Sequence, residues 1–271
     1  MLPEPIASVL ILAAAAAGAS SPPADWTPGV NAARAYAERR AGEVSFHVRT
    51  EAEHWSLDAD RTVASASVVK AMLMVAYLNQ PAVRGRALTA ADHGLLDPMI
   101  RWSDNDAATR VHNLVGETGL RTVARRSGMT RFTPQPAWGL SRISARDQTR
   151  MWLRFEQLVP RRHRAAALKL LGTIIPAQRW GVGAVRLPDG WKLHFKGGWG
   201  SGTGLVDHQV ALLRRGRARV ALAILTSGNP SHAYGNETLR GVATRLLRGL
   251  PGPQRGAHRS APRMPHRRFG R

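Results

Sequence analysis

A serine and a lysine three residues apart, Ser67 and Lys70, could together carry out nucleophilic chemistry. On a helix, residues with this spacing share a face, so the hydroxyl and the amine can come within hydrogen-bonding reach. A serine hydroxyl is a weak nucleophile until a base takes its proton, and a lysine is such a base only where its pKa is lowered. Residues 71–78 are apolar on nearly every side, which indicates a buried helix that Ser67 would open.

Two more short motifs follow along the chain, Ser103-Asp104-Asn105 and Lys196-Gly197-Gly198. The sequence uses lysine sparingly, since only 4 of its 39 basic residues are lysines and the other 35 are arginines. Arginine stays protonated in proteins and cannot act as a base. Two of the four lysines fall in the motifs, which indicates that lysine itself is needed there. The four are Lys70, Lys169, Lys192 and Lys196.

In this order, S-x-x-K, S-D-N and K-x-G resemble the motifs of class A β-lactamases and penicillin-binding proteins. The similarity extends over about residues 30–248, including the residues around S-D-N at 95–108 and the turn at 187–191. The resemblance implies an α/β (α+β) fold of the serine β-lactamase and D,D-peptidase type. In that fold, helices flank an antiparallel sheet built from both chain ends, and an all-helical lobe is inserted in the middle.

The resemblance also implies the catalytic roles. Ser67 is the nucleophile that becomes acylated, Lys70 is its general base, and Ser103 passes a proton to the leaving nitrogen. The backbone N–H groups of Ser67 and Trp199 form the oxyanion hole. Removing one such donor typically costs about 3–4 kcal/mol of transition-state stabilisation.

Substrate binding is assigned in the same way to Asn105, Lys196 and Gly198. Asn105 holds the substrate's side-chain amide and contacts Lys70, while Lys196 attracts the substrate carboxylate and steadies Ser103. The third motif departs from the family pattern, because Gly197 stands where a threonine or serine would offer a hydroxyl to that carboxylate. Two later hydroxyls are candidates to replace it: Ser201 and Thr203.

A second departure concerns the loop glutamate that activates the deacylating water in class A enzymes. The corresponding residues here, 132–142, contain no acid. Four other acids lie between Asp106 and Lys196, and we expect none of them to activate water. They are Glu117 in a turn, Asp147 in a capping box with Ser144, Glu156 within the helix that follows, and Asp189 in a turn. The sequence therefore predicts slow deacylation.

Strands are expected toward both chain ends, with helices between them. Alternation of apolar residues predicts strands at 43–49, 54–57, 191–198, 209–214 and 218–226, and apolar residues at helical spacing predict helices at 31–40 and 237–247. Helices are expected to dominate from 67 to 171. The reactive serine would then lie where the sheet and the helical lobe meet, which is a common place for a pocket.

The chain ends predict an exported protein. Residues 1–19 read as a signal peptide, with an apolar run and the small residues Ala17-Gly18-Ala19. The head lacks the usual positive charge, so an uncleaved N-terminal anchor is the alternative. A linker at 20–30 precedes a catalytic domain at 31–250, whose helical lobe spans about 67–185. With no cysteine, the chain has no disulfide and no lipid-modified cysteine.

A net charge of +21 comes in large part from the basic tail at 251–271, which we expect to be disordered. The tail could be attracted to anionic cell-wall polymers or to a membrane surface, and the alternative is a solvated tail without a partner. We expect the protein to be a monomer and to have no specific nucleic-acid partner. The sequence has no zinc-site spacing, phosphate loop or dinucleotide fingerprint, so we expect no metal and no cofactor. His194 alternates with Lys196 on the expected strand and is a candidate to border the site, but packing or exposure is the favoured interpretation.

Two functions remain open at this point. The first is an active-site serine hydrolase that β-lactams acylate, of the β-lactamase type, with a penicillin-binding D,D-peptidase acting on cell-wall peptides as its close alternative. The second is a non-catalytic binding protein on the same fold. The complete motif residues favour an enzyme, whereas the missing loop acid and Gly197 favour weak turnover.

Overall fold

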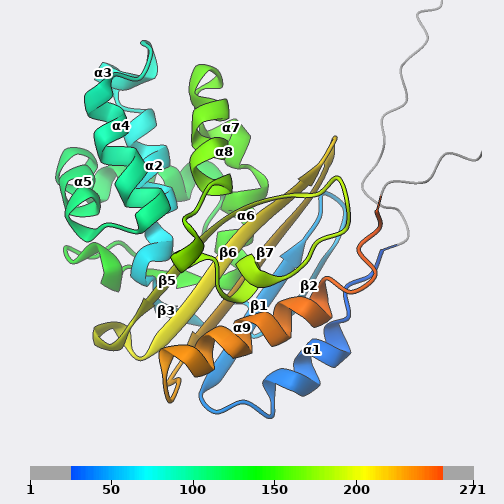
Figure 1. The fold of residues 1–271 in the computed structure, drawn as a ribbon. Coiled ribbons are helices and arrows are strands. Elements are labelled where there is room, and N and C mark those ends of the chain that lie inside the picture. The colour runs from blue at the N-terminus through cyan, green and yellow to red at the C-terminus, as the bar shows by residue number, and fades with distance from the viewer. Residues whose placement is uncertain (1–25, 253–271) are drawn as a thin grey trace, which may run out of the picture.

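The computed structural model describes residues 26–252 and divides them between an antiparallel sheet with its covering helices and a lobe of helices beside one end of the sheet (Figure 1). The predicted signal segment, most of the linker and nearly all of the basic tail lie outside these residues. Among residues 26–252, no helix has both the length and the apolar character needed to cross a bilayer.

The main sheet takes its strands from both ends of the chain, as predicted. Its order is β2-β1-β7-β6-β5, and all neighbours are antiparallel. The first and last thirds of the chain meet where β1 pairs with β7, with Phe46 opposite Ile224. The strands are β1 Glu43–Arg49, β2 His54–Leu57, β5 Lys192–Gly200, β6 Val206–Arg215 and β7 Ala218–Ser227.

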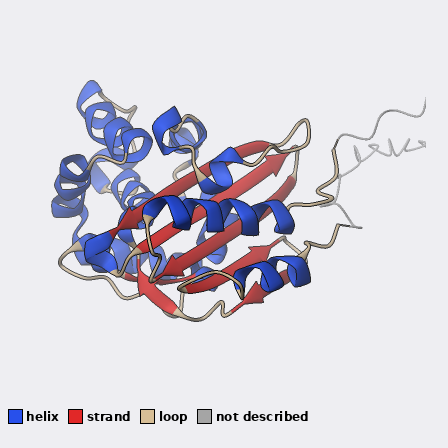
Figure 2. Ribbon diagram, turned by 60° about the horizontal axis from the view of Figure 1, so that its bottom comes forward, coloured by secondary structure: helices blue, strands red, loops and turns tan. Residues whose placement is uncertain are grey.

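Helices cover both faces of this sheet. The two terminal helices, α1 Val30–Ala37 and α9 His232–Leu246, lie side by side on one face (Figure 2). On the other side, α6 Ala145–Leu153 packs on β1 and β7, and α8 Arg164–Gly172 packs on β5. The central strands are therefore buried on both faces, which explains their nearly continuous apolar residues.

The helical lobe surrounds α2 Lys70–Leu78, in which every residue is buried. A turn of 3-10 helix, η1 Ala66–Val69, leads into α2, so Ser67 lies in the turn before the helix rather than at the helix start. A second pair of strands, β3 Thr62–Ala64 and β4 Arg142–Ser144, was not predicted. The remaining helices of the lobe are α3 Pro81–Arg84, α4 Ala90–Asp97, α5 Asn105–Ser127 and α7 Phe155–Leu158.

Several expected details differ in the structure. The first helix ends at Ala37, three residues before its expected end, and α9 begins at His232 because Ser231 caps it by accepting a hydrogen bond from the N–H of Tyr234. Glu117 lies within α5, just after a break at Gly116. Glu156 belongs to the separate helix α7, not to α6.

Asp92 anchors the outer side of the lobe and provides a stability prediction. Its buried carboxylate accepts hydrogen bonds from the Tyr77 hydroxyl, the Arg86 guanidinium and the N–H of Thr89, at 2.6, 2.5 and 2.6 Å. The ion pair with Arg86 is the main cause that holds the pKa of Asp92 well below its usual range. We expect Asp92→Asn to lower the free energy of unfolding by about 2–4 kcal/mol at pH 7.

The pH dependence follows from the lowered pKa. This carboxylate stabilises the fold fully above the usual carboxyl pKa, and its contribution is lost as the pH falls toward the folded-state pKa. In urea unfolding, the difference in free energy of unfolding between wild type and Asp92→Asn should therefore become smaller from pH 7 to pH 3. The control is Asp97→Asn, which removes a carboxylate that pairs with Arg101 and is more exposed than Asp92. It should lower the free energy of unfolding by less than about 1 kcal/mol. Equal effects of the two variants would contradict the prediction.

Candidate active site

Ser67 lies in a cavity of about 320 Å³ where the helical lobe meets the end of β5. This is the place that the sequence predicted for it. The cavity brings together residues from five separate stretches of the chain, and among those expected from the sequence it includes the nucleophile, two S-D-N residues and Trp199. Its lining consists of Ala66, Ser67, Ser103, Asn105, Trp138, Gly139, Gln178, Trp199 and Thr203.

The turn that carries Ser67 is tightly held. Ala66 has φ of +42°, a left-handed conformation that is uncommon outside glycine, and strained residues of this kind cluster at functional sites. The Ser65 hydroxyl lies 3.3 Å from the carbonyl oxygens of both Trp138 and Gly139, so the turn is tied to the loop across the cavity. The backbone of Ser67 is thereby fixed at the edge of the cavity.

Gly198 brings β5 against this turn. A Cβ atom at Gly198 would lie 2.7 Å from the backbone nitrogens of Ser67 and Val68, closer than real side chains allow. Only glycine permits this approach, and the next residue, Trp199, lines the same cavity as Ser67. Gly198 therefore shapes the site by having no side chain, and it does not itself line the cavity.

Lys70 is fully buried under the cavity. Its Nζ donates hydrogen bonds to the Ser103 carbonyl oxygen at 2.5 Å and to the Asn105 Oδ1 at 2.8 Å, and lies 3.4 Å from the Ser103 Oγ. Burial lowers the pKa of Lys70 to about 7, and the nearby Asp104 carboxylate partly opposes this shift. A lysine in this state is neutral in a large fraction of molecules at neutral pH, as a general base must be.

Lys196 approaches the same serine from the sheet. Its Nζ donates to the Ser103 Oγ at 2.9 Å and to the Gly197 carbonyl oxygen at 2.8 Å. Burial, together with the charge of Lys70, lowers the pKa of Lys196 well below its usual value. The structure thus places the Ser103 hydroxyl between two buried amines, which gives a path for a proton across the floor of the cavity.

The S-D-N residues are set at the start of α5. Ser103 has φ of +62°, and the Asp104 side chain caps the helix by accepting a hydrogen bond from the N–H of Ala107 at 2.6 Å. The cap fixes the turn so that Ser103 and Asn105 both face Lys70. Asp104 thus orients the motif and does not line the cavity.

The four acids considered from the sequence lie in other environments. Glu117 pairs with Arg121, and Glu156 pairs with Arg214 and Arg219. Asp147 accepts hydrogen bonds from the N–H groups of Thr130 and Arg131, so only half of the predicted capping box forms, the bond from its own N–H to the Ser144 hydroxyl. Asp189 lies in the exposed turn before β5.

Trp138 occupies the loop side of the cavity, where the sequence showed no acid. It starts the short turn η3 Trp138–Leu140, and its ring centre lies 4.9 Å from the Lys70 Nζ. Within residues 26–252, no carboxylate lines the cavity. The position of this tryptophan could not be predicted, because the loop has no periodic pattern.

The missing hydroxyl at Gly197 has a packing reason. A Cβ atom there would lie 3.0 Å from two ring carbons of Trp180, so a threonine would displace that ring. Of the two candidate replacements, Thr203 lines the serine cavity, whereas Ser201 lines a different one on the far side of Trp199. Gln178, which the sequence did not suggest, also faces the serine cavity.

Trp199 contacts a half-exposed histidine that is paired with a buried carboxylate. Its ring stacks on the His232 ring at 4.5 Å between centres, and His232 Nδ1 lies 2.5 Å from the Asp207 carboxylate. His194, a candidate to border the site, points elsewhere, because its Nδ1 donates to the Leu168 carbonyl oxygen in α8. Within residues 26–252, no group of three or more metal-ligating side chains lies together.

Comparisons with known proteins agree with this architecture. The model of a family described as the beta-lactamase enzyme family matches residues 83–250, a span that begins after Ser67 and Lys70 and includes the other two motifs. No curated protein matches the sequence. A β-lactamase from Sphaerobacter thermophilus is 22% identical with a TM-score of 0.68, covering 81% of this chain and 95% of that one.

Two further solved structures share the fold. A β-lactamase from Xanthomonas campestris pv. campestris is 18% identical with a TM-score of 0.70, covering 83% of this chain and 99% of that one. The structure of PBP-A is 15% identical with a TM-score of 0.64, covering 80% and 94%. The antiparallel sheet with its flanking helices and inserted lobe is therefore the fold of these proteins, as the sequence predicted.

Proposed function

Because the chain belongs to the beta-lactamase enzyme family, we propose that it is a serine hydrolase in which β-lactam antibiotics acylate Ser67. The observation that carries this proposal is the Ser103 hydroxyl, shared by two buried lysines at 2.9 and 3.4 Å on the floor of the cavity that Ser67 lines. Two amines with lowered pKa values around one hydroxyl have little structural benefit, but they suit proton transfer.

In the proposed reaction, Lys70 takes the proton of Ser67 as the serine oxygen attacks the lactam carbonyl carbon. The backbone N–H groups of Ser67 and Trp199 stabilise the oxyanion. The lactam C–N bond then breaks, and the proton passes from Lys70 through the Ser103 hydroxyl to the leaving nitrogen. Asn105 orients the side-chain amide of the substrate while its Oδ1 accepts a hydrogen bond from Lys70.

Carboxylate recognition would rest on Lys196 and Thr203. A bound carboxylate raises the pKa of Lys196 and keeps it charged, which offsets the effect of burial. Thr203 offers its hydroxyl from the same cavity, in place of the one missing at Gly197. Its hydroxyl donates to the Gly200 carbonyl oxygen at 3.0 Å in the free protein and would have to turn toward the substrate.

The test is the intact mass of the protein after mixing with a penicillin, followed over time. We expect a covalent adduct of one penicillin on wild type and none on Ser67→Ala. An adduct that forms equally on Ser67→Ala would disprove the assignment of the nucleophile. Failure of any adduct to form on the folded wild type would disprove the proposed activity.

A D,D-peptidase acting on cell-wall peptides is the second candidate. The absence of a carboxylate from the cavity lining within residues 26–252 favours it, because such an enzyme can transfer the acyl group to an amine without efficient hydrolysis. Release of D-alanine from a peptide ending in D-alanyl-D-alanine would distinguish it from a β-lactamase.

We also propose export, based on the apolar segment 6–17 and the small residues that follow it. N-terminal sequencing of protein secreted by a bacterial host should give a chain that begins near Ser20. A chain that keeps Met1 and stays in the cytosol would contradict the proposal. The basic tail would then meet anionic polymers outside the cell.

Gly198 gives a separate prediction. In Gly198→Ala, the new methyl group must push β5 away from the Ser67 turn and open the oxyanion hole. We expect acylation by a penicillin to slow by about 10² to 10³, the effect of losing one oxyanion donor. The control is Gly202→Ala, where a Cβ atom would meet nothing within 4 Å, and stopped-flow acylation should show it unchanged. Equal rates for the two variants would contradict this account.

A further inference from the structure

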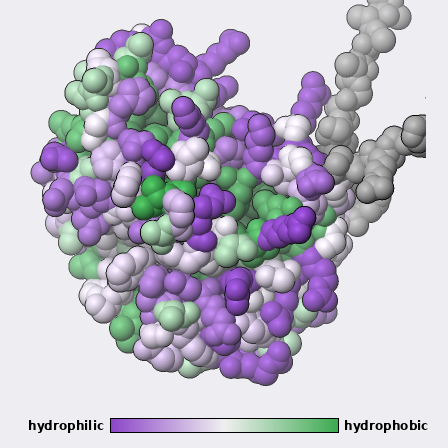
Figure 3. All heavy atoms as spheres, in the orientation of Figure 1, coloured by the Kyte–Doolittle hydropathy of each residue, from purple (hydrophilic) through white to green (hydrophobic). Residues whose placement is uncertain are grey.

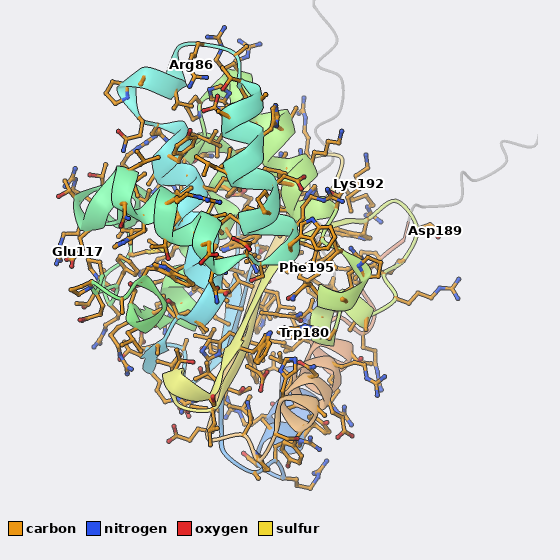
Figure 4. All side chains as sticks on the ribbon, turned by 60° about the vertical axis from the view of Figure 1, so that its left-hand side comes forward. Arg86, Glu117, Trp180, Asp189, Lys192 and Phe195 are labelled. Atoms are coloured by element: carbon orange, nitrogen blue, oxygen red, sulfur yellow. The ribbon has the colours of Figure 1, made fainter. Side chains whose placement is uncertain are left out.

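The two lysines that the active site does not use, Lys169 and Lys192, line a second cavity, of about 430 Å³. It lies between α8 and the first half of β5, with the residues before β5 closing its side. In Figure 4, Lys192 and Phe195 follow one another along this part of β5. Because this chain otherwise uses arginine for positive charge, the meeting of both remaining lysines in one cavity suggests a specific use.

The cavity carries uncompensated positive charge. Arg179 joins Lys169 and Lys192 in its lining, and within residues 26–252 none of these three cations forms an ion pair. Two acids lie near this end of β5: Glu156 already holds Arg214 and Arg219 at 3.0 and 2.8 Å, and Asp189, in the turn before the strand, forms no ion pair with the three cations. Three unpaired cations around one hollow favour an anionic ligand.

His194 provides a buried polar atom without a partner. The residue is only 7% exposed and lines the cavity; its Nδ1 donates to the Leu168 carbonyl oxygen at 2.8 Å, and its Nε2 has no partner within residues 26–252. Gly172, at the end of α8, makes room for the ring, because a Cβ atom there would lie 3.2 Å from Nδ1. Buried polar atoms normally have hydrogen-bond partners, so Nε2 is suited to a ligand.

The walls of the cavity are apolar. They are formed by Leu168, Val185, Leu187, Trp191 and Leu193. The space-filling view shows an apolar area in the middle of this face of the molecule, bordered by hydrophilic side chains (Figure 3). Apolar walls with a few charged groups are typical of sites for small organic ligands.

We propose that this cavity binds a small organic anion, a carboxylate or phosphate ester with an apolar body. The charged group would meet Lys169, Lys192 and Arg179, and the apolar body would lie on the leucine and tryptophan walls. An anion beside His194 would favour its protonated form, in which Nε2 donates to the ligand.

This site is separate from the serine cavity and goes beyond the proposed hydrolase activity. The two linings share no residue, although they are adjacent, since Gln178 faces the serine cavity and Arg179 faces this one. His194 and Lys196 also lie on the same face of β5, two residues apart.

The test is a calorimetric titration with 3-phenylpropanoate, 3-phenylpropyl phosphate, the neutral 3-phenylpropan-1-ol and inorganic phosphate. We expect at least one of the two organic anions to bind at least about tenfold more tightly than the alcohol and inorganic phosphate. The tighter of the two identifies the charged group. In Lys169→Gln/Lys192→Gln, we expect the affinity for this anion to fall by about tenfold or more. In NMR spectra of the wild type, the anion should shift the His194 Nε2 resonance, and in the double variant at the same anion concentration the resonance should not shift.

Matched variants locate the binding. Arg84→Gln/Arg125→Gln removes the same charge from two exposed positions elsewhere, and should bind like wild type. Lys196→Gln should also keep the affinity, which excludes binding in the serine cavity. The proposal is overturned if neither anion binds better than the alcohol, if the Arg84/Arg125 control loses as much affinity as the lysine variant, or if Lys196→Gln abolishes binding. None of these outcomes depends on β-lactam turnover.

Discussion

Replacing Lys70 with arginine is expected to abolish acylation of Ser67 by a fluorescent penicillin, with a loss of at least about 10³ in rate. Lys70 is fully buried and its pKa is lowered to about 7, so a large share of it is neutral and able to take a proton at neutral pH. Arginine remains charged in the same place. Its larger head must also displace the hydrogen bonds of the amine to Ser103 and Asn105.

The pH profile separates this role from a structural one. Because the pKa of Lys70 lies near 7, the neutral form increases as the pH rises, and the acylation rate should climb through about pH 7 and then level off. Ser67→Ala defines the background of the labelling, and circular dichroism should show that Lys70→Arg is folded. A rate that does not change between pH 5 and 9, or labelling of Lys70→Arg at the wild-type rate, would assign the base to another group.

The sequence predicted the strands well because their signals are local. Val44, Phe46 and Val48 alternate along β1, and both β1 and β2 have the expected bounds. The pair β3 and β4 was missed because each is only three residues long and Thr62 finds its partner in Ser144, far along the chain. Such pairing depends on the completed fold, not on a local pattern.

The active site, too, could be predicted only where residue spacing or the family resemblance indicates its residues. Residue types and spacing predicted one site for Ser67 and Lys70, and the structure places Ser67 in the cavity and Lys70 beneath it, without a hydrogen bond between the two side chains. The hydrogen bond from Lys196 to Ser103 joins residues 93 positions apart and was expected only from the family resemblance. Trp138 could not be placed, since nothing in its loop indicates that the ring would face Lys70. The packing of Trp180 on Gly197 was equally out of reach, although it explains the altered third motif.

Hydrolysis of the acyl-enzyme needs a positioned and activated water. Trp138 lines the loop side of the cavity, where a class A enzyme carries its glutamate. Its ring has no basic atom, and its N–H donates to the Thr109 hydroxyl at 3.2 Å. Lys70, whose Nζ lies 4.9 Å from the centre of that ring, is the base on this side of the cavity, and it must serve acylation and deacylation in turn.

We therefore expect a stoichiometric burst with a chromogenic cephalosporin, followed by steady turnover slower by about 10² to 10⁴, the usual cost of a missing general base. Quench-flow mixing with mass detection should show the acyl-enzyme accumulating to nearly one per protein. Glu117→Gln and Asp189→Asn are the controls, because Glu117 lies on the outer side of the helical lobe and Asp189 on the turn before β5, at opposite sides of the molecule (Figure 4). Both should keep the burst and the slow phase. Fast turnover without a trapped adduct would mean that another group activates water, and loss of turnover in either control would identify that group.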